Sequence, residues 1–265
     1  MIQPLSYIHP EAKIAQNVVV EPFSTIHKDV VIGEGTWIGS NVTIMNGARI
    51  GKNCRIFPGA VISGEPQDLK FEGEVTTVEI GDNTTIRECV TINRGTKDRY
   101  RTVIGKNCLI QAYSHIAHDC FVGDYCIFSN SSTLAGHITV GDYVVLAGMV
   151  AVHQFCQIGS HAFVTGGTLV RKDVPPFIKA AREPISYAGI NSVGLRRRGF
   201  TAEQITEIQD IYRVLFVQNR NLTKALDLIE AEFAPTELRD EILSFVRSSN
   251  RGVIKGFNQG RNSSL

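Results

Sequence analysis

Four of the seven histidines lie between positions 115 and 153, each beside residues suited to polar chemistry. They belong to the segments His115-Ile-Ala-His118-Asp119, Ala135-Gly136-His137 and His153-Gln154-Phe155. An imidazole with its ordinary pKa near 6.5 is an efficient general base at neutral pH and contributes about 10²–10⁴-fold in rate. An adjacent aspartate can orient the imidazole, and a glycine N–H can stabilise an oxyanion because no side chain crowds it. These residue types suit acyl transfer to a hydroxyl, provided that the fold brings the three segments together.

A six-residue repeat predicts how the segments are placed. Every sixth residue from Ile8 to Val170 is apolar, except Asp68, Glu74 and Asp98. Helices repeat every 3.6 residues and strands every 2, whereas the coils of a hexapeptide β-helix repeat every six. We therefore predict a mainly β chain: a left-handed parallel β-helix of hexapeptide repeats with a small C-terminal α-helical domain. The left hand is that of the fold class, because periodicity alone does not show it.

Three hexads make one 18-residue coil, and successive coils stack about 4.8 Å apart. Residues 18 apart should therefore lie over one another. This rule predicts one column of His118, Gly136 and Gln154, and a neighbouring column of Asp119 and His137. A base, an acid and a glycine amide would then meet at one place on the prism.

The repeat also predicts the domains. Residues 1–190 are expected to form the β-helix, with polar loops at about 64–78 and 93–103 where the repeat fails and then resumes. Residues 191–255 are expected to form a helical domain, with a capping box from Thr201 to Gln204, and 256–265 a disordered tail. The glycines that follow repeat residues, such as Gly33 and Gly81, are expected at turns that need a positive φ.

Composition excludes several classes of protein. The 27 Lys and Arg residues nearly balance the 26 Asp and Glu residues, which argues against nucleic acid or a membrane surface as partner. No apolar run is long enough to span a bilayer, and the first residues do not resemble a signal peptide, so a cytoplasmic protein without stable membrane insertion is expected. The six cysteines include no C-x-x-C pair and are expected to be small apolar core residues in a reducing compartment.

Other interpretations of the same residues remain open. The histidines could solvate one face of the prism, or imidazoles from different coils or subunits could bind zinc, although no strong metal motif is present. Gln67, Asp68 and Lys70 suit hydrogen bonding to a sugar but could equally face solvent. The run Arg196-Arg197-Arg198 could be a solvated basic turn, or could bind a phosphate or an acidic carrier protein.

Several motifs carry a resemblance to a known family. The segments GEPQDLKFEGE, VEIGDNTTIRECVTINRGT, HIAHDC, TLAGH, AVHQFC, DVPPF and GLRRRGF together resemble the UDP-N-acetylglucosamine O-acyltransferases, which catalyse the first step of lipid A biosynthesis. The resemblance covers nearly the whole chain. It implies a homotrimer with active sites between adjacent subunits, and no cofactor or metal. It also implies transfer of an (R)-3-hydroxyacyl chain from acyl carrier protein to the 3-hydroxyl of UDP-N-acetylglucosamine.

The resemblance also implies roles for individual residues. His118 would be the general base, Asp119 its orienting partner and Gly136 the oxyanion donor. Asp68, Lys70 and His137, beside Gln67, would hold the sugar. His115 and His153 would line the cleft. The resemblance assigns contacts with the nucleotide or the carrier to Gln154, Asn191, Arg197 and Arg198.

Two features bear on specificity. The family's best-known members carry an acidic residue soon after the counterpart of Asn191, where this chain has Ser192-Val193, so part of the uridine contact differs. The family measures acyl length by side-chain bulk at the blind end of the cleft, where this chain has Gly166, which predicts a long donor.

Three competing functions are weighed against this assignment. The related N-acyltransferases carry an N-terminal uridine-binding domain, for which a repeat beginning at Ile8 leaves no room. A zinc-dependent carbonic anhydrase would not explain QDLK or the helical part. A β-helix scaffold would have no reason to place four histidines and an aspartate on adjoining columns.

Overall fold

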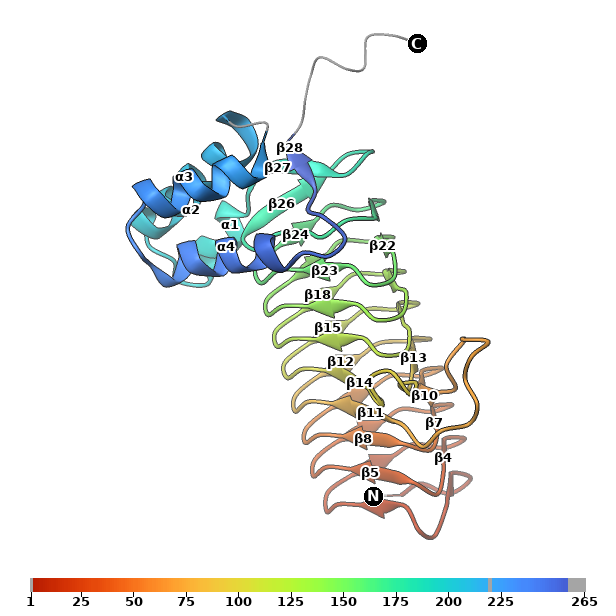
Figure 1. Cartoon of the computed structure of the whole chain (residues 1–265). Coiled ribbons are helices and arrows are strands. Elements are labelled where there is room, and N and C mark those ends of the chain that lie inside the picture. The colour runs from red at the N-terminus through yellow and green to blue at the C-terminus, as the bar shows by residue number, and fades with distance from the viewer. Residues whose placement is uncertain (1, 219–220, 257–265) are drawn as a thin grey trace.

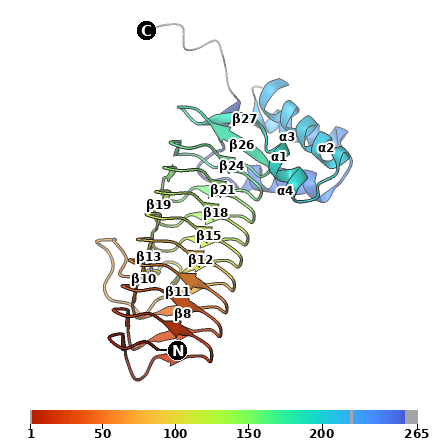
Figure 2. The ribbon, with the colours of Figure 1, turned by 180° about the vertical axis from the view of Figure 1, so that it is seen from behind.

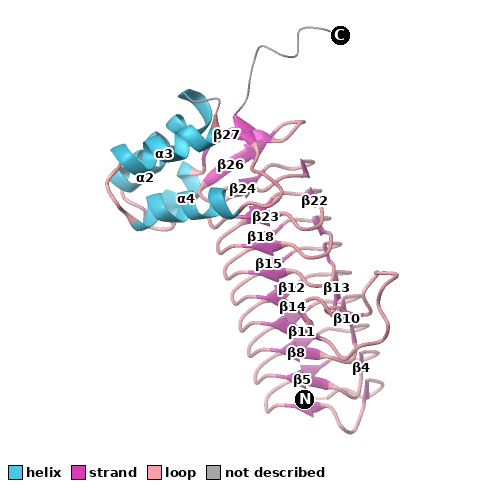
Figure 3. Cartoon of the chain, in the orientation of Figure 1, coloured by secondary structure: helices cyan, strands magenta, loops and turns pink. Residues whose placement is uncertain are grey.

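The computed structural model, which describes residues 2–218 and 221–256, is a three-sided rod with helices at one end (Figure 1). The strands are short, and each face of the rod is a sheet whose parallel strands come from successive coils (Figure 3). The repeat produces this form because each repeat residue points into the prism. From Val20 to Val170, every apolar repeat residue is at most 4% exposed.

The chain visits three sheets in turn, named here sheets 1, 2 and 3. In the part of the chain that the structure describes, sheet 1 has nine strands: β1 (Tyr7–Ile8), β4 (Thr25–Ile26), β7 (Thr43–Ile44), β10 (Val61–Gly64), β13 (Thr91–Asn93), β16 (His115–Ile116), β19 (Thr133–Leu134), β22 (Ala151–Val152) and β25 (Leu169–Val170). Sheet 2 has eight over the same residues: β2 (Lys13–Ile14), β5 (Val30–Ile32), β8 (Ala48–Ile50), β11 (Thr77–Ile80), β14 (Arg101–Ile104), β17 (Phe121–Val122), β20 (Thr139–Val140) and β23 (Gln157–Ile158). Sheet 3 has eleven described strands: β3 (Val19–Val20), β6 (Trp37–Ile38), β9 (Arg55–Ile56), β12 (Thr85–Ile86), β15 (Leu109–Ile110), β18 (Ile127–Phe128), β21 (Val145–Leu146), β24 (Phe163–Val164), β26 (Ile178–Ala181), β27 (Ser186–Ile190) and β28 (Lys255–Gly256).

Two insertions leave the prism at one corner, where the chain passes from sheet 1 to sheet 2. Strand pairing joins residues 18 apart in most coils, as for Thr43 and Val61. The offset rises to 30 between Val61 and Thr91 and to 24 between Thr91 and His115. The additional residues form loop 65–76 and loop 94–100, which lie within the ranges of about 64–78 and 93–103 given above, and the core continues past both (Figure 2).

The predicted reason for the glycines after repeat residues is wrong. Gly33 and Gly81 do not have a positive φ; a Cβ at either would lie 2.6–2.8 Å from the backbone of the next coil, so close packing requires glycine there. The left-handed conformation occurs two residues later, at positions such as Asn41 and Asn107, with φ of 58° and 56°. Asparagine adopts this conformation more readily than most residues.

The cysteine prediction holds for five of the six residues. Cys54, Cys108, Cys120, Cys126 and Cys156 are buried, free thiols. Cys89 is exposed, and its φ of 56° shows that it occupies the left-handed corner position, one residue before the inward-facing slot. The core-filler prediction is therefore wrong for Cys89.

The helices lie beside the last coils. They are α1 (Ser192–Arg197), α2 (Ala202–Arg213), a π-helical turn η1 (Val214–Gln218), α3 (Leu222–Glu232) and α4 (Glu237–Ser248). The predicted capping box at the start of α2 is confirmed by reciprocal Thr201 and Gln204 bonds. The fully buried Tyr212 of α2 donates a hydrogen bond of 2.7 Å to the carbonyl of Pro176, which ties the helices to the end of the prism.

We propose the division into 1–190 and 191–255, which falls between β27 and α1. Strand β27 runs antiparallel to β26, so the last part of the prism is a hairpin rather than a coil. Gly256, assigned above to the tail, belongs to β28 and pairs with Tyr187 of β27. The rest of the predicted tail, 257–265, lies outside the described residues. Within the described residues, no helix is both long and apolar enough to cross a membrane.

Candidate active site

The repeated register of the coils brings three segments together at the corner between sheets 1 and 2. His118 and Asp119 follow β16, Gly136 and His137 follow β19, and Phe155 follows β22. The backbone N–H of His137 donates to the carbonyl of His118 at 3.1 Å, and the N–H of Phe155 donates to that of Gly136 at 3.2 Å. The predicted stacking is thereby confirmed for these coils.

His118 and Asp119 form a buried dyad. The Nδ1 atom of His118 lies 2.8 Å from Oδ2 of Asp119, whose side chain is completely buried. The Asp119 carboxylate also accepts bonds from the Thr96 N–H, at 3.0 and 3.2 Å, from the Thr96 hydroxyl at 2.7 Å and from the Arg99 N–H at 3.1 Å. Both of these residues belong to loop 94–100, so the inserted loop holds the acid in place.

The hydrogen bonds keep Asp119 ionised. Burial acts to raise the pKa of this carboxyl, but the bonds from His118, Thr96 and Arg99 together outweigh it and lower the pKa to about 2. An ionised Asp119 can only accept, so the proton of the neutral imidazole resides on Nδ1 of His118 and Nε2 keeps a free lone pair. The dyad therefore leaves Nε2 of His118 able to accept a proton.

Gly136 lies directly against the His118 ring. A Cβ at this position would lie 2.6 Å from Cε1 and 2.8 Å from Nε2 of His118. Across residues 2–218 and 221–256, none of the hydrogen bonds uses the Gly136 N–H. Pro22 and Pro58 occupy the corresponding position of the hexad at another corner of the prism, so this kind of turn does not require an N–H there. This N–H is consequently available to a ligand beside the base.

His137 lies between the dyad and an aromatic ring. Its imidazole is perpendicular to that of His118, with centroids 5.0 Å apart, and stacks on Phe155 at 4.5 Å. Its Nδ1 is 3.0 Å from Oδ2 of Asp98 and 3.9 Å from Oδ2 of Asp119. Asp119 and His137 both occupy the left-handed corner position, with φ of 59° and 64°.

The remaining predicted cleft residues lie around this centre. His115, in β16, has its Nδ1 atom 2.7 Å from the Thr91 hydroxyl. Burial lowers the pKa of His115, and the nearby His118 lowers it further. His153 and Gln154 are exposed and lie one coil beyond Gly136.

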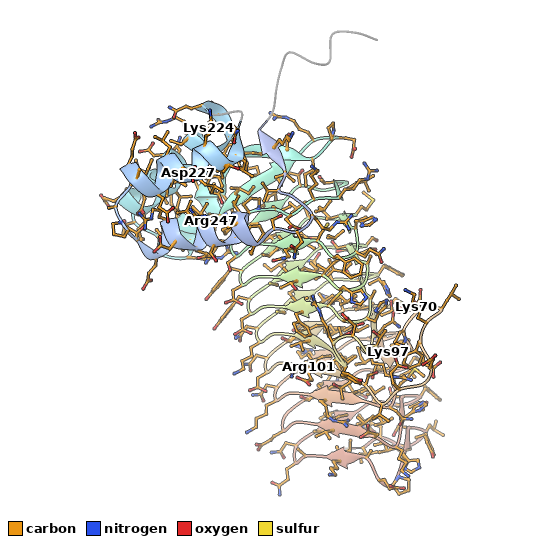
Figure 4. All side chains as sticks on the ribbon, in the orientation of Figure 1. Lys70, Lys97, Arg101, Lys224, Asp227 and Arg247 are labelled. Carbon is orange, nitrogen blue, oxygen red and sulfur yellow. The ribbon has the colours of Figure 1, made fainter. Side chains whose placement is uncertain are left out.

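The sugar-binding candidates lie on loop 65–76. Gln67 and Lys70 are exposed, and Asp68 accepts a bond from the N–H of Lys70 at 3.0 Å. Lys70 lies on the projecting part of the loop, on the same side of the prism as Lys97 (Figure 4). A hydrogen bond of 2.9 Å from the Lys97 N–H to the Glu74 carboxylate connects this loop to loop 94–100. Among the described residues, no hydrogen bond connects Gln67, Asp68 or Lys70 to the histidines.

Asn191, Arg197 and Arg198 lie at a different corner, between sheets 2 and 3. Asn191 caps α1, accepting from Gly194 at 3.3 Å and donating to the His161 carbonyl at 2.9 Å. The Arg198 guanidinium lies over Tyr143 at 5.1 Å, and burial lowers its pKa, whereas Arg197 is exposed. A single chain does not bring these residues to His118.

Gly166 lies at the third corner, between β24 and β25. The atom nearest to a Cβ at this position is the Gly148 carbonyl oxygen of the adjacent coil, at 3.1 Å. The predicted acyl ruler is therefore also separate from His118 within one chain.

Three contacting residues were missed by the sequence reasoning. Thr96, Asp98 and Arg99 bind Asp119 or His137 from loop 94–100. The available signal was the failure of the repeat at Asp98, which identified the loop but not its contacts.

The cluster could in principle hold a cation. Ligand atoms of His118, Asp119 and His137 lie within 4.8 Å of one another. However, Asp119 already accepts four hydrogen bonds from loop 94–100 in addition to its contact with His118. Two histidines and a carboxylate can bind a metal, but this carboxylate is engaged as a hydrogen-bond acceptor on both oxygens.

Comparison with known proteins gives the family. Residues 173–254 match the family model described as Udp N-acetylglucosamine O-acyltransferase, domain 2, and residues 29–64 and 101–136 match the bacterial transferase hexapeptide repeat. A curated acyl-[acyl-carrier-protein]–UDP-N-acetylglucosamine O-acyltransferase of Xanthomonas oryzae is 49% identical over 258 residues, which cover 96% of this chain and 98% of the relative. The chain belongs to the UDP-N-acetylglucosamine O-acyltransferase family.

Solved structures agree with this membership. A UDP-N-acetylglucosamine acyltransferase from Bacteroides fragilis is 49% identical with a TM-score of 0.95, over 96% of this chain and 100% of that one. Another from Francisella novicida is 41% identical with a TM-score of 0.94, over 97% and 95%. The predicted fold class, a left-handed β-helix with C-terminal helices, is confirmed, and so is the assignment to an acyltransferase family.

Proposed function

We propose that this protein transfers an (R)-3-hydroxyacyl chain from acyl carrier protein to the 3-hydroxyl of UDP-N-acetylglucosamine, the first step of lipid A biosynthesis. Near full-length similarity to enzymes named for this reaction supports the proposal. The observation that carries the mechanism is the buried His118–Asp119 dyad placed against Gly136.

In the proposed step, Nε2 of His118 removes the proton of the sugar 3-hydroxyl as its oxygen attacks the thioester carbonyl. The tetrahedral intermediate collapses, the C–S bond breaks, and the carrier thiolate takes the proton from the imidazolium. Asp119 stays ionised throughout and stabilises the transient positive charge on His118. No cofactor or metal enters this step.

The Gly136 N–H is proposed to stabilise the oxyanion. A preorganised donor of this kind contributes about 10²–10³-fold to such reactions. Its lack of a partner among the described atoms, together with its position against the His118 ring, supports this role.

The proposed binding residues lie at different corners of one chain, and assembly of several chains would bring them together. We propose a homotrimer in which each active site lies between adjacent subunits. Gln67, Asp68, Lys70 and His137 would bind the sugar, with His115 and His153 lining the cleft. Gln154, Asn191, Arg197 and Arg198 would contact the nucleotide or the carrier. In one chain, Asn191 and Arg198 lie at a corner other than that of His118, so they can complete a site only if a second subunit is adjacent.

We also propose a cytoplasmic location. The six free thiols of the described chain suit a reducing compartment, and the proposed partners are a nucleotide sugar and an acyl carrier.

An assay of the purified protein with UDP-N-acetylglucosamine and 3-hydroxyacyl carrier proteins of graded length tests the function directly. His118→Ala should lose nearly all turnover while the oligomer remains intact. The control is His27→Ala, at the same corner but several coils away, which should leave the rate unchanged. If His118→Ala keeps even a tenth of the activity, His118 is not the base; if the parent shows no transfer, the function itself is wrong.

A further inference from the structure

Asp98 occupies a repeat position that would face the core in an ordinary coil, but loop 94–100 turns it outward. Its side chain is 58% exposed and its Oδ2 lies 3.0 Å from Nδ1 of His137. The same oxygen is 4.0 Å from Nε of Arg99. The contact with His137 is the shortest of these, so the carboxylate is directed at the imidazole.

The backbone of Asp98 is tied to the dyad. Its N–H donates to the Thr96 hydroxyl at 3.3 Å, and that hydroxyl donates to Asp119 at 2.7 Å. Loop 94–100 thus sets the positions of the Asp98 and Asp119 carboxylates together. The result is a second carboxylate–imidazole pair, Asp98–His137, beside the pair of Asp119 and His118.

The histidines of the two pairs lie near the same oxygen of Asp119. Nδ1 of His137 is 3.9 Å from Oδ2 of Asp119, the oxygen that also contacts Nδ1 of His118 at 2.8 Å. Without Asp98, the nearest carboxylate for His137 would be Asp119. His137 would then compete with His118 for its orienting acid.

We propose that Asp98 is a positioning residue that accepts the Nδ1 proton of His137, fixing that imidazole with Nε2 as an acceptor for the substrate and keeping it away from Asp119. The consequence for catalysis rests on the proposed function, in which His137 contacts the sugar. With Nδ1 engaged, Nε2 of His137 can accept a hydrogen bond from a hydroxyl or N–H of the nucleotide sugar. A carboxylate that orients a metal-ligating histidine typically contributes about 10–100-fold, and the exposure of Asp98 places its expected effect on His137 at the lower end of that range.

The test compares Asp98→Ala with Asp98→Asn. Asp98→Ala should raise KM for UDP-N-acetylglucosamine about 10-fold, and kcat should fall several-fold as His137 competes for Asp119. Asp98→Asn keeps an acceptor oxygen and should lie between the alanine variant and the parent. The matched control is Glu72→Gln, which removes a carboxylate paired with Lys97 at 3.5 Å in the same pair of loops and should leave both constants unchanged.

A spectroscopic measurement separates this proposal from the proposed function. In ¹⁵N-histidine-labelled protein, two-bond ¹⁵N–¹H correlations report the tautomer of each imidazole without any substrate. His137 should be the Nδ1–H form in the parent and lose that preference in Asp98→Ala. An unchanged tautomer in Asp98→Ala would overturn the positioning role whether or not the protein transfers acyl chains. In a protein that does transfer them, equal KM changes in Asp98→Ala and Glu72→Gln would also overturn it.

Discussion

Gly136→Ala tests the geometry of the proposed centre most directly, because it adds one methyl group beside the base. The new Cβ would lie 2.6 Å from Cε1 and 2.8 Å from Nε2 of His118, whereas ordinary contacts begin at 3.4 Å. Gly136 does not have a positive φ, so alanine is compatible with its backbone. The three nearest atoms all belong to the imidazole, which must move by roughly 0.6–0.8 Å.

The expected result is a folded but weakly active enzyme. Moving the ring stretches the 2.8 Å contact with Asp119 and shifts Nε2 away from the substrate hydroxyl. A misplacement of about 1 Å can lower the rate by about 10²-fold, within the 10²–10⁴-fold that a general base contributes. Stability should change by less than about 1 kcal/mol, since the group that yields is the end of a side chain.

Gly148→Ala is the control for stability. Gly148 occupies the corresponding position of the hexad at the corner between sheets 3 and 1, and its Cβ would meet only the Asn130 carbonyl, at 3.5 Å. Urea unfolding and steady-state acyl transfer measure the two quantities. If Gly136→Ala remains folded and retains more than a third of the parent kcat, His118 does not act from the position described.

Three further predictions concern the metal, the acyl chain and pH. Prolonged chelation should leave activity unchanged, because Asp119 is saturated by hydrogen bonds; activity restored by added zinc would favour metal chemistry. Gly166→Met should shift the preference in the graded-carrier assay towards shorter chains, since the proposed ruler position gains a bulky side chain, and an unaltered length profile would refute the ruler. Folding lowers the pKa of Asp119 to about 2 from its ordinary 3.8, so the ionised form stabilises the fold above about pH 4 and this contribution, about 2 kcal/mol, is lost as the pH falls towards 2. Urea unfolding at stepped pH should show a shallower decline for Asp119→Asn, and parallel curves would contradict this account.

The sequence could predict the column of His118 and Gly136 because no insertion interrupts the repeat between Ile104 and Val170. The strands from β14 to β25 that pair with one another do so 18 residues apart, so His118 must lie over Gly136. The periodic burial of repeat residues was predictable for the same reason.

The contacts of loop 94–100 could not be predicted in this way. The insertion raises the pairing offset to 24, and no fixed spacing relates Thr96 to Asp119 across it. Asn191 and Arg198 lie beyond the repeat altogether, so their placement depended on how α1 packs against the last coils. The error about glycine conformation has a local cause: close packing and positive φ both select glycine, and composition does not distinguish them.

The place where the repeat fails is also where the site acquires its charge. A buried carboxylate costs several kcal/mol unless hydrogen bonds replace its water. A regular corner supplies few free donors, because its backbone groups bond to the adjacent coils. Loop 94–100 leaves the prism one coil below Asp119 and provides the N–H groups of Thr96 and Arg99 and a hydroxyl. The ionised acid, and with it the basic Nε2 of His118, therefore depends on the interruption of the hexapeptide repeat rather than on the repeat itself.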